Sequence, residues 1–399
     1  MWRGVTRKRV AQISAWLVAL YAVDVLVPII DTLGLPLPRY VAFMSLSAVF
    51  ILLALGVLIP MARRHRIPEL GSAGLAMVGI LLFWSGVEFI GTAGRGPIRF
   101  DLVLEFVPLL LVMVAARAHL RLFGDPQLLV STLILTAIFL VLAHTVLVLA
   151  VLLGMPLRFV NAGELQGRNA MALLVPMCLW LLVFFPLKSW DVFTRPYNLL
   201  LALALVNIML NSARSALLIL LWVVLVGAAL RLPALRPWLR RSLAPAGLGI
   251  VMGSMLAYPV MVMGLDELAH VFVGQNDDAT SVWSRAQTNA MLLAKFAQNP
   301  LLGIGWDEVA ATKAYGYMGH TLYVNVFAAY GIIGALAAIW LLSVGLLRTE
   351  GRNREVAAHL LFLAVLVATF NNNVFAYFGV AIALIGAVKL PSVFGGKKN

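Results

Sequence analysis

Long apolar stretches separated by short polar turns make up most of the chain, and they predict membrane-spanning helices. A helix that crosses a hydrocarbon core of about 30 Å needs about 20 residues, or fewer where neighbouring helices shelter its ends. By this criterion the sequence contains twelve candidate spans. They cover residues 10–30, 41–61, 70–90, 102–116, 128–153, 170–187, 197–210, 215–230, 243–263, 322–347, 357–370 and 374–388.

The positions of lysine and arginine orient these spans. When the chain is threaded with its amino terminus in the cytoplasm, only nine of the 30 Lys and Arg residues fall outside. They are Arg39, Arg95, Arg99, Arg158, Arg168, Arg214, Arg285, Lys295 and Lys313. Cytoplasmic loops of membrane proteins carry an excess of these residues. We therefore expect an even number of spans with both termini in the cytoplasm.

The composition also indicates a membrane protein with several spans. Of the 399 residues 62% are hydrophobic and 12% are charged, and the mean hydropathy is +0.97, whereas soluble domains carry about 25% charged residues. The net charge of +13 would suggest a nucleic-acid partner in a soluble chain. In a membrane protein basic residues report orientation and contact with lipid headgroups, so we expect no nucleic acid. The single cysteine, Cys178, excludes a disulfide framework and a cysteine-based metal cluster.

One outer loop differs from the others in length and polarity. It divides the chain into residues 1–263 with nine spans, a polar loop over 264–320, and residues 321–399 with three spans and a tail. The middle of the loop predicts a helix that ends at Asn299-Pro300, followed by a turn over residues 300–305. Loops of more than 50 residues are usually functional rather than simple connections. We expect this loop to form a wall of a site.

Four cationic or titratable side chains lie at the outer mouths of apolar spans: Arg168, Arg214, Arg285 and His320. Each has an ordinary interpretation, such as an arginine that reaches lipid headgroups or a satisfied interfacial histidine. An ionisable residue at a membrane edge is nevertheless a functional-site hypothesis. Guanidinium groups bind phosphate in bidentate fashion, and a histidine can accept a proton near neutral pH. Together they indicate a phosphate-bearing substrate.

The order of these residues resembles the O-antigen ligase and polymerase superfamily. His320-Thr321, nine residues, and then Gly331 and Gly334 match a pattern of histidine followed by Gly-x-x-Gly; the family usually has Asn, Ser or Gln where Thr321 stands. We expect the two glycines to leave a groove on one helix face for close packing. The other matching stretches are Gly167-Arg168-Asn169, Ser212-Ala213-Arg214-Ser215, and Arg285 followed by Asn299-Pro300-Leu301-Leu302-Gly303-Ile304-Gly305.

This resemblance implies an all-α, polytopic membrane protein with a GT-C-like glycosyltransferase architecture in the bacterial inner membrane, with its active site facing the periplasm. It implies an O-antigen ligase that transfers glycan from undecaprenyl diphosphate to the lipid A core oligosaccharide. His320 would be the general base, and Arg168, Arg214 and Arg285 would bind the donor diphosphate. We expect no metal or other cofactor, because the chain has no Asp-x-Asp motif; Asp277-Asp278 comes nearest. Inversion at the anomeric carbon would follow from a single displacement.

Two alternatives remain at this stage. A polymerase of the same superfamily would join carrier-linked glycans to one another, and many such enzymes have two sizeable outer loops where this chain has one. A lipid or glycan transporter would use intramembrane carboxylates such as Asp24, Glu88 and Glu105 as relays. These carboxylates are scattered along the chain without a detectable inverted repeat, which favours structural pairing with nearby arginines over a relay, and the single long outer loop favours the ligase over the polymerase.

The distribution of cations makes a direct prediction of topology. Reporter proteins fused after Arg121 and after Arg241 should give a cytoplasmic signal, and one fused near Gln275 should give a periplasmic signal. A cytoplasmic signal at Gln275 would place the long loop on the wrong side for a cell-surface glycan and would contradict the interpretation of the four residues.

Overall fold

The computed structural model of the chain describes part of it. The described residues are 7–23, 48–64, 78–79, 81–86, 101–153, 168–187, 194–210, 214–231, 291–292, 294–305, 322–347, 356–357, 359–360, 362–364, 367 and 377–387.

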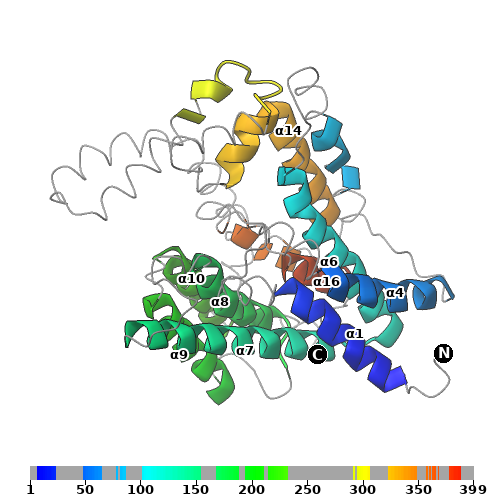
Figure 1. Ribbon diagram of the computed structural model, residues 1–399, viewed down its shortest axis with the longest axis vertical. Coiled ribbons are helices and arrows are strands. Elements are labelled where there is room, and N and C mark those ends of the chain that lie inside the picture. Colours follow the sequence, from blue (N-terminus) through cyan, green and yellow to red (C-terminus); the bar gives the residue numbers. More distant parts are fainter. Residues whose placement is uncertain are drawn as a thin grey trace, which may run out of the picture.

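The described part is all-α, as predicted, and contains no β-strand (Figure 1). Its helices lie on predicted spans. They are α1 (Arg7–Ala22), α4 (Ala48–Arg64), α6 (Asp101–Phe123), α7 (Pro126–Leu152), α8 (Arg168–Phe184), α9 (Arg195–Leu210), α10 (Arg214–Arg231), α14 (Leu322–Leu347) and α16 (Tyr377–Ala387). The predicted span over residues 243–263 lies outside the described residues.

The junction between α6 and α7 shows how local sequence sets a helix boundary. Gly124 has φ of 67°, and its N–H donates to the carbonyl of Leu120 at 2.9 Å, which closes the last turn of α6. Asp125 then accepts a hydrogen bond from the N–H of Leu128 at 3.0 Å. Pro126 occupies the first position of α7, where its missing N–H costs nothing. Three consecutive residues therefore end one helix and begin the next.

One apolar core joins α1, α4, α6, α7, α8, α9, α10 and α16, and α6 packs against four of these helices. Gly379 of α16 lies against the backbone of α6, where an added Cβ would be 2.9 Å from the amide nitrogen of Met113. On another side α1 packs against α4, α6 and α7. Arg7 donates to the carbonyl of Leu122, and Ser14 Oγ lies 2.7 Å from Nδ1 of the buried His119. Both contacts lie on the part of α6 that runs to Phe123, beyond the predicted end of its span at residue 116.

The outer faces of the helices are apolar as well as the inner ones. Along α7 the side chains of Leu135, Phe139, Leu142, Val146 and Leu149 are exposed, at a spacing of three or four residues. A helix that is hydrophobic all round is either buried or faces lipid. The segment Pro126–Val146, with a mean hydropathy of 2.3, is the one described helix that is long and apolar enough to cross a membrane. The count of twelve spans remains a prediction.

The predicted single span over residues 322–347 is wrong in one respect. Gly331 has φ of 66° and ψ of −173°, which is outside the helical range and divides α14 into two limbs. Figure 1 shows the limbs diverging from a sharp bend. The apolar pattern continues through the break without interruption, so hydropathy alone did not reveal it.

The buried His119 predicts how stability depends on pH. Burial lowers the pKa of His119 from 6.5 to about 4, although Asp125 opposes this shift. The folded protein therefore keeps this imidazole neutral down to about pH 4, whereas the unfolded chain binds a proton below about pH 6.5. The free energy of unfolding therefore decreases as the pH falls from 6.5 to about 4, by about 3 kcal/mol over the whole range.

His119→Gln should remove this contribution. Thermal unfolding of the purified protein and of the variant should be measured between pH 7 and pH 4. The wild-type protein should lose more stability over this range than the variant, because other titrating groups cancel in the comparison. Parallel pH profiles would show that His119 is protonated as easily in the folded protein as in the unfolded chain.

Candidate functional site

Two of the four predicted site residues are the first residues of helices. Arg168 begins α8 and Arg214 begins α10, and these two helices pack against each other. The first N–H groups of a helix have no partner within the helix, and the helix dipole places partial positive charge there. A guanidinium at this position adds a full positive charge to an environment that already favours anions.

Helix α9 lies between α8 and α10 in the chain and contacts both of them. Residues 211–213 connect α9 to α10, and α9 packs against both α8 and α10. Tyr197 and Ala204 of α9 and Leu179 of α8 are buried and belong to the apolar core. Apolar packing in this three-helix group therefore positions the backbone at Arg168 and Arg214.

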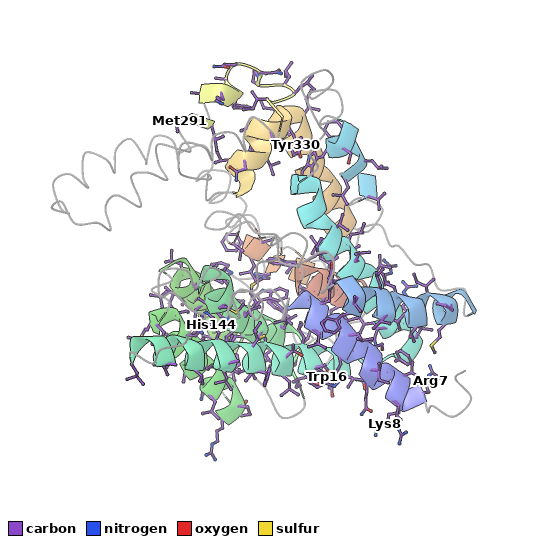
Figure 2. All side chains as sticks on the ribbon, viewed as in Figure 1. Arg7, Lys8, Trp16, His144, Met291 and Tyr330 are labelled. Carbon is purple, nitrogen blue, oxygen red and sulfur yellow. The ribbon has the colours of Figure 1, made fainter. Side chains whose placement is uncertain are left out.

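The other notable feature is the bend of α14. Residues 299–305 lie against it, and Figure 2 shows Tyr330 near the bend with Met291 at the start of the neighbouring segment. In an uninterrupted helix each N–H donates to the carbonyl four residues earlier. Here the amides of Ile332 and Ile333 donate to the neighbouring segment, and the carbonyls of Ala328 and Ala329 accept from it.

We call this arrangement the backbone clasp and define it as residues 300–305 together with residues 328–333. Four main-chain hydrogen bonds form it. They are Ile304 N–H to Ala328 O (2.9 Å), Gly305 N–H to Ala329 O (3.0 Å), Ile332 N–H to Pro300 O (2.8 Å) and Ile333 N–H to Leu301 O (3.2 Å). A buried main-chain group without a partner costs about 1–3 kcal/mol. The clasp avoids this cost for the carbonyls of the buried residues Ala328 and Ala329, whereas Leu301, Ile332 and Ile333 of the other two bonds are exposed.

The two halves of the clasp are equivalent to one another. Each half uses two carbonyls, then a glycine of positive φ, then two amides, and each amide of one half bonds to the corresponding carbonyl of the other. The sequences share this pattern: Pro300-Leu301-Leu302-Gly303-Ile304 corresponds to Ala328-Ala329-Tyr330-Gly331-Ile332. Each segment is thus an open helical turn that the other segment completes.

Glycine is required at the centre of both halves. Gly303 and Gly331 have φ of 77° and 66°, values that L side chains rarely adopt. A Cβ on Gly303 would collide with the backbone of Ala329 and Gly331, and one on Gly331 would collide with the backbone of Leu301 and Leu302. Neither collision is relieved by a side-chain movement, because the obstacle is main chain.

Aromatic contacts hold the clasp from two sides. Phe296, in the segment before it, packs edge-on against Phe327 of α14 with ring centroids 6.2 Å apart. Tyr330 is fully buried and stacks on Trp84 at 4.9 Å with an interplanar angle of 7°. A Cβ on Gly334 would be 3.4 Å from Phe83 and 3.6 Å from Trp84.

These contacts correct the sequence interpretation of the two glycines. Gly331 and Gly334 both serve close packing, as predicted, but they do not form one groove on one helix face. Gly331 lies in the break and faces residues 301–302, whereas Gly334 lies beside Tyr330 and the helical segment that contains Trp84. The turn predicted over residues 300–305 is confirmed, but its partner was missed. The repeated pattern of three residues followed by Gly-Ile was the available signal.

The remaining two predicted residues, Arg285 and His320, lie outside the described residues. In the sequence Arg285 precedes the described segment that begins at Met291, and His320 precedes the start of α14 at Leu322. The clasp thus joins the segment that follows Arg285 to the helix that follows His320. Within the described residues, α8 and α10 pack against each other, and the positions of Arg285 and His320 relative to them lie outside the part of the chain that the structure describes.

The described residues contain no candidate metal site. Within the described ranges, no group of three or more His, Cys, Asp or Glu side chains is placed to hold a metal ion. The Asp277-Asp278 pair lies outside those ranges.

No protein-family model and no curated protein matches the chain. The family resemblance therefore rests on the sequence motifs themselves.

Proposed function

We propose that this protein is a membrane-embedded O-antigen ligase. It would span the bacterial inner membrane about twelve times in a GT-C-like arrangement, with both termini in the cytoplasm and the site facing the periplasm. It would transfer glycan from undecaprenyl diphosphate to the lipid A core oligosaccharide. The apolar outer faces of α7 and its neighbours support the membrane environment, because such surfaces are unfavourable in water.

The observation that carries the proposal is the pair of helices that begin with arginine. A glycan leaving its carrier transfers negative charge to the diphosphate, and catalysis depends on groups that stabilise that charge as it develops. Arg168 and Arg214 begin two helices that pack together. Two guanidiniums with two helix amino termini suit a diphosphate better than a singly charged ligand.

The chemistry requires one displacement. The acceptor hydroxyl attacks the anomeric carbon, the bond from that carbon to the phosphate oxygen breaks, and the carrier diphosphate leaves with the electron pair. His320 would take the proton of the acceptor hydroxyl, since an unperturbed imidazole is a suitable base at neutral pH. Arg285 would contact the diphosphate together with Arg168 and Arg214. Attack from the face opposite the leaving group inverts the anomeric centre.

Substitutions should separate these roles. Arg214→Lys keeps the charge but loses the planar paired donors, so it should lose most transfer activity and bind carrier-linked donor more weakly. His320→Ala should reduce turnover at saturating donor by about 10²- to 10⁴-fold and leave donor binding largely intact. Turnover and donor affinity should be measured for each purified variant.

Arg195→Lys is the matched control. Arg195 is also the first residue of a helix and is exposed, but the predicted topology puts it on the cytoplasmic side. It should retain wild-type activity. If Arg214→Lys behaved like Arg195→Lys, the guanidinium of Arg214 would have no role in donor binding. If His320→Ala weakened donor binding and left turnover unchanged, His320 would be a binding residue rather than the base.

A further inference from the structure

The backbone clasp provides an inference that rests on the proposed function and extends it. Its two halves lie on segments that follow the predicted donor ligand Arg285 and the predicted base His320 in the chain. We propose that the clasp is a positioning element: Gly303 and Gly331 hold the segment after Arg285 and the start of α14 in one fixed arrangement. Neither glycine would touch the substrate.

The reciprocal hydrogen bonds make the clasp a single unit. Because each open turn is completed only by the other, loss of one half removes the partners of both. Either half alone would expose two free amides and two free carbonyls, which are unfavourable in a buried or lipid-facing location. The clasp should therefore be either closed or open, with no stable half-formed state.

Positioning has a large effect on a reaction of this type. A displacement of about 1 Å between reacting groups can reduce the rate about 10²-fold. Besides the four hydrogen bonds of the clasp, the ring contact between Phe296 and Phe327 joins the segment to α14. These contacts fix the orientation of the segment relative to α14.

Hydrogen exchange tests the clasp without reference to activity. Gly303→Ala places a Cβ into the backbone of Ala329 and Gly331. In the purified full-length variant, exchange should become faster in peptides over residues 300–305 and also in peptides over residues 322–335, which lie on the other segment. Gly331→Ala should produce the same two changes. Faster exchange confined to the substituted segment would overturn the proposal.

Gly124→Ala is the matched control for backbone strain. Gly124 has φ of 67°, nearly the same as Gly331, but a Cβ there would meet nothing within 4 Å. It therefore introduces the left-handed strain without the collision. This variant should keep wild-type exchange in both clasp segments. If Gly124→Ala also accelerated exchange there, general destabilisation rather than the clasp would explain the result.

Kinetics test the positioning role. Gly303→Ala and Gly331→Ala should each lower kcat about 10²-fold with a much smaller change in KM for the donor, and Gly124→Ala should leave both near wild type. The double variant should be no slower than the slower single variant, because one substitution already opens the unit. Fold losses that multiply in the double variant, or an unchanged kcat in a variant whose clasp is open by hydrogen exchange, would show that the clasp does not position the site.

A milder substitution covers the case in which the alanine variants do not fold. Phe296→Leu weakens the ring contact with Phe327 and leaves the glycines unchanged. It should produce the same pattern at smaller size: faster exchange in both segments and a lower kcat.

A wild-type protein with a closed clasp but no glycan transfer would contradict the proposed function, whereas the exchange experiment would still decide whether the two segments act as one unit.

Discussion

A helix that is interrupted inside a protein or a membrane must find new partners for its backbone groups, and this requirement organises the region around α14. The break at Gly331 releases two carbonyls and two amides, and residues 300–305 bond to all four. Such close approach of two backbones excludes any Cβ, which explains glycine at 303 and 331. The edge contact of Phe296 with Phe327 joins the same two segments, and Trp84, from the helical residues 81–86, stacks on Tyr330 next to the break.

The apolar stretches of the sequence predicted most of the described helices. Their lengths located α7 and α10 to within two residues and α8 to within three. The predicted span stops short of the end of α6 because it followed the apolar run, which ends before Arg117, whereas the helix continues through polar residues to the local stop at Gly124. The break in α14 was missed for a related reason: its partner is a distant segment, and hydropathy carries no information about main-chain partners.

The candidate site shows the same division between local and long-range information. Arg168 and Arg214 were identified from charge at the mouths of apolar spans, and both begin helices that pack together. Arg285 and His320 belong to stretches joined by the clasp, which links two motifs that appear independent in the sequence. Under the proposed function, the first pair provides fixed positive charge for a leaving diphosphate, and the second brings a further guanidinium and a base into register.

The most direct measurement is the identity of the acceptor. The purified protein should be reconstituted in lipid with an undecaprenyl diphosphate-linked glycan and with lipid A core oligosaccharide, and the products should be identified by mass. A ligase transfers the glycan to the core and releases the carrier diphosphate, and this is the result we expect. A longer glycan that remains on the carrier would identify a polymerase, and unchanged reactants with correctly inserted protein would contradict glycan transfer altogether.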